Sequence, residues 1–214
     1  AMARGELNGG NTALDDGPSL TQDWTLDPTG NWLGFDQGIA DPLEQTRQHN
    51  AVNEITDIDK AFGAFWPIPD YDGNGNTVSF PDPRSLPSSL TATYDAWNRL
   101  VKLEDGGGTV AEYQYDGLNR RIAKTIDSAV RHAYFSDRWQ VLEERVDSST
   151  DAERQFVWGE RYVDDLVLRD RTSERLYALQ DELFNVVALT DDTGDVKERF
   201  AYQPYGLSQA LNPN

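Results

Sequence analysis

A segment of about 22 residues recurs along this chain, and that period restricts the fold to a small set of repeat architectures. Five heptamers start 23, 22, 23 and 21 residues apart. In order they are Leu26-Asp27-Pro28-Thr29-Gly30-Asn31-Trp32, His49-Asn50-Ala51-Val52-Asn53-Glu54-Ile55, Tyr71-Asp72-Gly73-Asn74-Gly75-Asn76-Thr77, Tyr94-Asp95-Ala96-Trp97-Asn98-Arg99-Leu100 and Tyr115-Asp116-Gly117-Leu118-Asn119-Arg120-Arg121. The second position is always Asp or Asn, and the fifth is always Gly or Asn.

These two columns indicate a tight turn between strands. Gly and Asn tolerate a left-handed backbone better than other residues do. A side-chain oxygen three residues earlier can accept hydrogen bonds from the amides inside the turn. We therefore predict positive φ angles at the five residues of the fifth column, which are Gly30, Asn53, Gly75, Asn98 and Asn119.

Alternating side chains between the turns predict strands rather than helices. Residues 105–108 read Asp-Gly-Gly-Gly and predict a hairpin tip between strands 100–104 and 109–115. Phe135, Trp158, Gln180 and Tyr202 continue the period at intervals of 23, 22 and 22 residues. The fold class is therefore all-β, built from tandem antiparallel hairpins with two strands and two turns in each repeat.

We expect residues 1–23 to be a leader or the remnant of an earlier repeat, and residues 24–214 to form the repeat domain. Five of the ten prolines lie between Trp66 and Ser88. Proline cannot donate a hydrogen bond to a sheet, so we expect a Pro-rich surface loop near residues 80–90.

Charge and composition exclude several classes of function. The net charge is −18 and the isoelectric point is near 4.3, so phosphate backbones and anionic lipids are poor partners. There is no Cys, which removes disulfides, thiol catalysis and thiolate metal sites. No apolar run reaches the length of a membrane span, and we expect neither nucleic-acid binding nor membrane insertion. No signal peptide is visible, so we expect any export signal to lie outside this sequence.

Several of these motifs resemble the YD motif of Rhs proteins, usually written YDxxGRL and preceded by xYxYD. The resemblance rests on Tyr94-Asp95-Ala96-Trp97-Asn98-Arg99-Leu100 and on Tyr113-x-Tyr115-Asp116-x-x-Asn119-Arg120. Trp158-Gly159 with Arg161-Tyr162-Val163-Asp164 is similar to Rhs sequence further along. Gln180-Asp181, Asn185 to Asp191, Gly194, Tyr202 and Pro204-Tyr205-Gly206 resemble the segment that leads into the Rhs-associated core. The similarity extends from about Trp24 to Gly206.

The resemblance implies a fold and a role. Rhs/YD proteins, with the shells of Tc-toxin cocoons and of teneurins, wind repeated hairpins into a curved or spiralling sheet that closes as a hollow β-shell. In polymorphic toxins the shell encloses a C-terminal effector, which an aspartic autoprotease in the core releases. This sequence ends before such a core. It departs from the motif at Leu26 and His49, which replace the Tyr, so the first repeats are expected to pack differently.

Two motifs invite a catalytic or metal-binding interpretation. Asp192-Thr193-Gly194 is the tripeptide of aspartic peptidases, but Asp191 and Asp195 flank it and favour a solvated turn over a buried carboxylate pair. The segment 70–76 matches positions 1, 3, 5 and 6 of a calcium loop, yet Pro81 stands where the bidentate Glu belongs. One more YD turn is the simpler interpretation, and weak calcium binding stays the alternative.

The remaining candidate side chains fit structural roles. His49 and His132 are the only histidines and do not have metal-ligand spacing. Arg side chains near Trp97 and Asn119 could bind sugars, but they are more simply turn residues stacked on neighbouring rings. We therefore predict no catalytic, cofactor-binding or metal-binding residues, no cofactor, and a protein that is not an enzyme.

The sequence favours a non-catalytic structural segment of a secreted or cell-surface bacterial shell, whose partner is an effector or toxin polypeptide of the parent protein. The alternative is a carbohydrate-binding or adhesive surface module that uses exposed Trp and Tyr rings. A shell fragment must also expose strand edges. We expect either edge-to-edge pairing into a homo-oligomer or coverage of one edge by the chain's own N-terminal residues.

Overall fold

The computed structural model describes residues 2–4, 20–39, 42–202 and 208–211. These residues form 19 strands and no helix, which confirms the all-β prediction. By their contacts they divide into two compact units, Ala1–Val110 and Ala111–Asn214. Pro204-Tyr205-Gly206, part of the sequence resemblance, lies outside the described residues.

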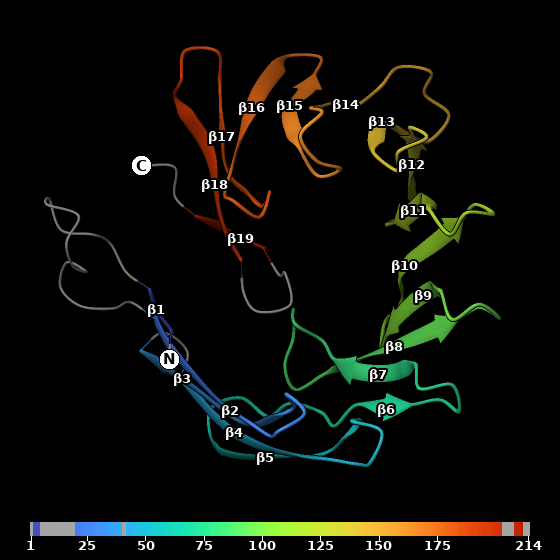
Figure 1. The fold of residues 1–214 in the computed structure, drawn as a ribbon. Coiled ribbons are helices and arrows are strands. Elements are labelled where there is room, and N and C mark those ends of the chain that lie inside the picture. The colour runs from blue at the N-terminus through green and yellow to red at the C-terminus, as the bar shows by residue number, and fades with distance from the viewer. Residues whose placement is uncertain (1, 5–19, 40–41, 203–207, 212–214) are drawn as a thin grey trace, which may run out of the picture. The chain divides into compact units, whose positions relative to one another are not determined.

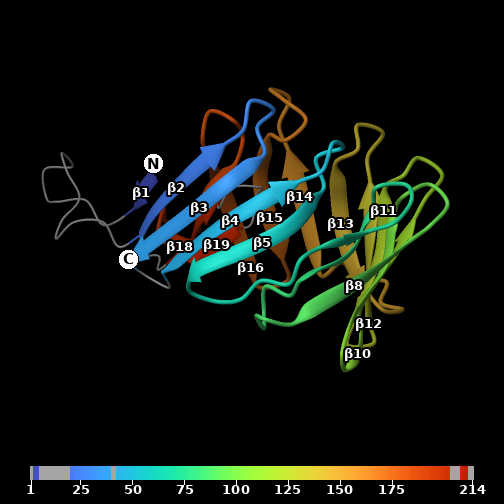
Figure 2. The same ribbon diagram turned by 90° about the horizontal axis from the view of Figure 1, so that it is seen from below.

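Unit 1 contains nine strands and the start of a tenth. The strands are β1 (Met2–Arg4), β2 (Leu20–Leu26), β3 (Trp32–Ile39), β4 (Leu43–His49), β5 (Ile55–Phe62), β6 (Asp70–Tyr71), β7 (Thr77–Pro81), β8 (Ser89–Tyr94) and β9 (Leu100–Asp105). Strands β1 to β5 form one antiparallel sheet in chain order, and β6 to β9 follow one another in the same way. Figure 2 shows β2 to β5 side by side.

Unit 2 continues the same pattern. Its strands are β10 (Gly108–Tyr115, which begins in unit 1), β11 (Arg121–Ile126), β12 (Ala129–Phe135), β13 (Val141–Val146), β14 (Arg154–Trp158), β15 (Leu166–Arg171), β16 (Glu174–Gln180), β17 (Val186–Thr190), β18 (Val196–Tyr202) and β19 (Ser208–Leu211). Each pairs antiparallel with the next along the chain, as Figure 1 shows. The tandem antiparallel hairpins are therefore confirmed.

The described N-terminal residues include two paired strands. Strand β2 begins at Leu20, so Leu20 to Asp23 belong to the sheet. Strand β1 pairs with β2, with Met2 opposite Gln22 and Arg4 opposite Leu20. Residues 2–4 thus pair with part of the edge of β2, over Leu20 to Gln22.

The Pro-rich loop is shorter than expected. Phe80 pairs with Leu90 and Pro81 with Ser89, so the loop proper is residues 82–88. Asp82 is buried and organises this loop. Its carboxylate accepts hydrogen bonds from the Arg84 amide (2.9 Å) and from the Arg84 guanidinium (2.9 and 2.7 Å). The Asp82 carboxylate thus accepts hydrogen bonds from one backbone amide and one side chain of the loop. The prolines of the loop have no amide hydrogen with which to pair in a sheet.

In the described part of the sheets, six large apolar residues and four alanines occupy the buried apolar positions. In unit 1 the buried apolar residues are Phe35, Leu43, Ile58, Leu90 and Ala92, and in unit 2 they are Ala111, Ala123, Leu176, Ala188 and Leu189. Most are single positions on successive strands, as expected of a repeat protein whose hairpins pack against their neighbours.

Candidate functional site

The most regular feature of both units is a row of turns, one at the same end of each hairpin. Asp116 to Arg120 is a representative turn. The Asp116 amide donates to the Arg120 carbonyl at 3.0 Å, and the Asn119 amide donates to the Asp116 carbonyl at 3.1 Å. The same two backbone bonds occur in the turns that begin at Asp27, Asn50, Asp72, Asp95, Ser136 and Asp181.

The first side chain of the turn caps its amides. Asp116 Oδ1 accepts from the amides of Leu118 and Arg120, each at 2.9 Å, and Asp116 Oδ2 accepts from Arg120 Nε at 2.7 Å. Asp95 binds Trp97 and Arg99 in the same way. In these two turns one carboxylate satisfies two backbone donors and the Arg side chain four residues on. Asn50 caps the same two amides of its own turn through its side-chain oxygen.

These hydrogen bonds stabilise the charged form of the capping carboxylates. The side-chain amide of Asn76, followed by backbone amides in the turn, lowers the pKa of Asp72 below its ordinary value. The Asn31 and Thr29 side chains lower the pKa of Asp27 likewise. For Asp116 partial burial acts to raise the pKa, but hydrogen bonds from the Arg120 backbone and side chain outweigh it, so the pKa is lowered.

The fourth residue of each turn has a left-handed backbone. The angle φ is +91° at Gly30, +67° at Asn53, +82° at Gly75, +59° at Asn98 and +65° at Asn119. All five sequence predictions are therefore confirmed.

Two further turns place large aromatic residues in this conformation. Trp139 has a φ of +69° and Phe184 a φ of +62°. Sequence reasoning missed both, because a search for Gly or Asn passes over them. The only available signal was the spacing from Phe135 and Gln180, which precede the two turns.

In four of the described repeats an aromatic residue at the end of a strand ties its hairpin to the preceding one. The Tyr71 hydroxyl accepts from the Ile55 amide at 3.1 Å, and the Tyr94 hydroxyl donates to the Thr77 carbonyl at 3.1 Å. Trp158 Nε1 donates to the Val141 carbonyl and the Tyr202 hydroxyl to the Val186 carbonyl, each at 2.7 Å. We call these contacts the aromatic latches. Each reaches the first residue of the strand that follows the previous turn, which explains the Tyr of the YD motif.

Neighbouring turns are also bonded to each other. Asn31 Nδ2 donates to Asn53 Oδ1 at 2.9 Å, and Asn76 Nδ2 donates to Asn98 Oδ1 at 3.0 Å. The sixth position of the heptamer thus donates one repeat ahead, to the fifth position of the next.

The two motifs with a catalytic or metal-binding interpretation are both turns in the structure. Asp191 Oδ1 accepts from the amides of Thr193 and Asp195, each at 3.0 Å, and Gly194 has a φ of +90°. Asp192-Thr193-Gly194 thus lies in a capped turn between β17 and β18, as expected. In residues 70–76 the Asp72 carboxylate is bonded to Asn74 and Asn76 of its own turn.

Within the described ranges, no group of three or more His, Asp or Glu side chains is arranged to hold a metal ion. His49 ends β4, in the column that Tyr occupies elsewhere, and His132 lies in β12. The basic side chains near the turns stack on rings: the Arg99 guanidinium lies 5.2 Å from the Trp97 ring and that of Arg121 5.4 Å from the Tyr113 ring. The predicted stacking is confirmed.

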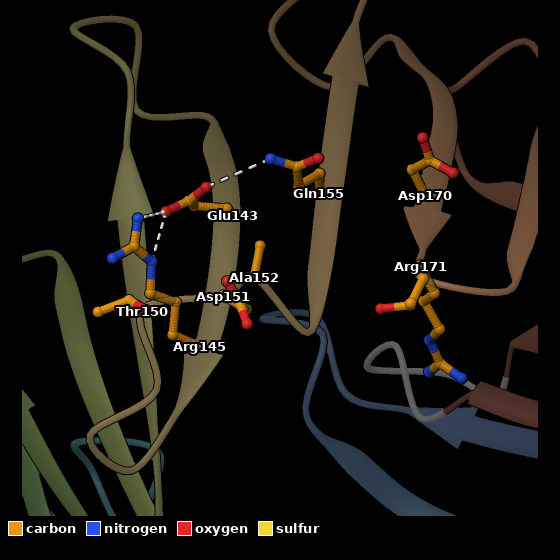
Figure 3. Close-up of a pocket in the computed structure, with 9 residues that line it drawn as sticks. Glu143, Arg145, Thr150, Asp151, Ala152, Gln155, Asp170 and Arg171 are labelled. Carbon is orange, nitrogen blue, oxygen red and sulfur yellow. Dashed lines mark hydrogen bonds and ion pairs between the residues drawn. The ribbon is translucent and has the colours of Figure 1, made fainter.

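In unit 2 a polar pocket of about 510 Å³ lies between β13, β14 and β15 (Figure 3). Its lining residues are Glu143, Arg145, Thr150, Asp151, Ala152, Gln155, Asp170, Arg171 and Thr172. Arg145 Nε donates to Glu143 Oε1 at 2.7 Å, and the side-chain amide of Gln155 donates to Glu143 Oε2 at 3.4 Å. A hydrogen bond from Arg175 lowers the pKa of Asp170. Glu143, Arg145, Asp170 and Arg171 of the pocket thus each have an ion pair or hydrogen bond with a neighbouring side chain.

Capped turns, aromatic latches and turn-to-turn bonds define a class, the antiparallel β-hairpin repeat protein. Residues 94–129, which hold the turns at Asp95 and Asp116, match the family model described as RHS Repeat. Over this segment the chain is similar to the Rhs repeat family. No match is found among curated proteins.

Solved structures give distant similarities. The chain is similar to the Tc holotoxin pore of Photorhabdus luminescens, at 12% identity and a TM-score of 0.32, over 91% of this chain and 15% of that one. It is similar to the crystal structure of TcdB2-TccC3-TEV, at 10% identity and a TM-score of 0.34, over 95% and 16%. The chain thus spans less than a fifth of these chains. At such TM-scores, function has to be argued from the chain's own residues.

Proposed function

We propose that this chain is a wall segment of an Rhs/YD shell, and that it serves to enclose or present an effector polypeptide of the parent protein. The observation that supports this most is the repetition of one hairpin unit, with a side-chain cap in most of its turns and an aromatic latch to the previous hairpin in four of its described repeats. Such a unit can be added indefinitely without changing its contacts, as an extended wall requires. The role is structural rather than catalytic.

A secreted or cell-surface location in bacteria follows from the same proposal. The acidic composition suits a surface that stays soluble and repels anionic lipid. In the part of the chain that the structure describes, no helix has the length and apolar character to cross a membrane.

Limited proteolysis of the parent protein tests enclosure. Residues beyond the repeats should resist a protease in the native parent and be cut once Asn98→Val and Asn119→Val disrupt two turns. A parent with Val157→Thr, on an exposed strand position, is the matched control. Equal cleavage in the native parent and in the turn variant would remove the proposal.

A second candidate function is carbohydrate binding by an adhesive module, and one observation favours it. Trp97 is 72% exposed at the tip of its turn, with the Arg99 guanidinium over its ring, and an exposed aromatic ring can stack on a sugar ring. A glycan array separates the two candidates. Glycan binding that is lost in Trp97→Ala supports the adhesive role. An array without signal contradicts it and favours the wall segment.

A further inference from the structure

Four successive turns of unit 2 each present a large apolar side chain to solvent. Leu118 is 56% exposed, Trp139 55%, Tyr162 55% and Leu183 77%. We call these four residues the apolar ridge. They come from the turns 116–120, 136–140, 159–165 and 181–185, which all lie at the capped end of their hairpins. Exposed apolar side chains that gather on one edge are typical of an interaction site.

The ridge is held in a fixed arrangement by contacts between its turns. Arg120 Nη1 donates to the Ser136 carbonyl at 3.2 Å, and Gln140 Nε2 donates to the Val163 carbonyl at 3.0 Å. The Tyr162 ring stacks on Phe184 with a centroid distance of 5.0 Å and an interplanar angle of 23°. A pre-ordered surface loses little conformational entropy on binding, which favours affinity.

Trp139 gives a second, independent indication of function. Its φ of +69° is the angle that five other turns assign to Gly or Asn. A bulky side chain is unfavourable there, and more than half of this ring remains in water. Strained residues cluster at binding sites, where the side chain has a use that outweighs its conformational cost.

Charge near the ridge indicates the kind of partner. Asp137, Glu160, Asp164 and Glu182 are all exposed in the same turns. The exposed cations there are Arg138 and Arg161, and Arg161 is already paired with Asp165. Together with the net charge of −18, this balance favours a basic partner.

The spacing of the capped turns indicates the conformation of the partner. Neighbouring capped turns are separated by two strands, or about 9.6 Å. A polyproline II helix repeats every three residues and advances about 9.3 Å in doing so. Side chains at every third residue of such a segment therefore meet successive turns.

We propose that the apolar ridge binds an extended, basic polypeptide segment in the polyproline II conformation, with an apolar side chain at every third residue. The Lys or Arg side chains between them pair with the exposed carboxylates of the turns. This interaction goes beyond enclosure and does not depend on it.

A labelled synthetic peptide tests the proposal on the whole chain. The probe is a fluorescein-labelled 12-mer of four Leu-Pro-Lys triplets, titrated by fluorescence anisotropy. We expect saturable binding that weakens at least tenfold in Trp139→Asn and in Leu183→Ser. A probe with Glu in place of Lys, or Ser in place of Leu, should also bind at least tenfold more weakly. Val157→Ser, at an exposed strand position outside the ridge, should bind as the native chain does.

The Trp139→Asn variant separates binding from folding. Asn tolerates the left-handed backbone, so the Tm should rise by about 2–6 °C while binding falls. Absence of saturable binding, equal binding of the Glu probe, or unchanged binding in both ridge variants would each overturn the proposal. So would a native dimer in sedimentation that Trp139→Asn dissociates, because the ridge would then belong to a second copy of the chain.

Discussion

Asn98 offers the sharpest test of the capped turn, because two substitutions separate its two roles. Its backbone has a φ of +59°, and its side-chain oxygen accepts a hydrogen bond from Asn76 at 3.0 Å. Asn98→Gly keeps the backbone conformation and removes the hydrogen bond. Asn98→Val removes the hydrogen bond and places a β-branched residue at a left-handed angle.

The expected sizes follow from these contacts. Loss of one exposed hydrogen bond costs about 0.5 kcal/mol, at the low end of the usual range. A β-branched residue at this angle adds about 1–2 kcal/mol. The free energy of unfolding should therefore fall by about 0.5 kcal/mol in Asn98→Gly and by about 1.5–2.5 kcal/mol in Asn98→Val.

Urea unfolding followed by far-UV circular dichroism measures both values on the whole chain. Thr93→Val, at an exposed strand position of β8, controls for the added Val side chain. If Asn98→Val and Asn98→Gly unfold at the same urea concentration, left-handed geometry does not select the residue at this position and the argument for the turn fails.

Three further predictions concern pH, charge and the latches. The pKa of Asp72 is lower in the folded chain than its ordinary value; its stabilising contribution is therefore complete above that ordinary value and is lost as the pH falls through the lowered one. The Tm should drop below about pH 4, and less steeply in Asp72→Asn. On β2, β3 and β4 the carboxylates of Asp23, Asp36 and Glu44 lie directly opposite one another. Asp36→Lys should therefore raise the free energy of unfolding by about 0.5 kcal/mol in low salt, and an equal effect in 1 M salt would contradict the electrostatic cause. Tyr94→Phe removes the latch to Thr77 and should cost about 0.5–1.5 kcal/mol in urea unfolding, whereas no loss would show that the latch is dispensable.

Much of the fold could be predicted from the sequence because backbone conformation and short-range hydrogen bonds determine which residue types occur in its turns. The Asp and Gly or Asn columns identified five left-handed residues, and residues 105–108 identified the end of β9 and the start of β10. The same reasoning overestimated the length of the Pro-rich loop. Pro81 needs no amide donor in its pair with Ser89, so it remains in β7.

Other features depend on contacts that a linear pattern does not carry. Trp139 and Phe184 contradict the preference of their own backbone positions, so no propensity argument could find them. The latch from Trp158 to Val141 joins residues 17 positions apart, through an indole where other repeats use a phenol. The apolar ridge follows from which residues share an end of the hairpins, and this required the register of every strand.

The latches restrict the insertions and deletions that such a chain can accept during evolution. Because each latch spans 16 or 17 residues and each cap only four, a gain or loss of one complete period leaves both intact. A gain of a few residues between latch and cap would break them. Chain length should therefore vary in whole-repeat steps, and smaller insertions should favour the opposite ends of the hairpins. Among the described residues, three of the four seven-residue connections, 63–69, 82–88 and 147–153, lie there. The fourth, 159–165, lies at the capped end; it keeps the Trp158 latch, but its capping side chain is Asp165 at the end of the turn.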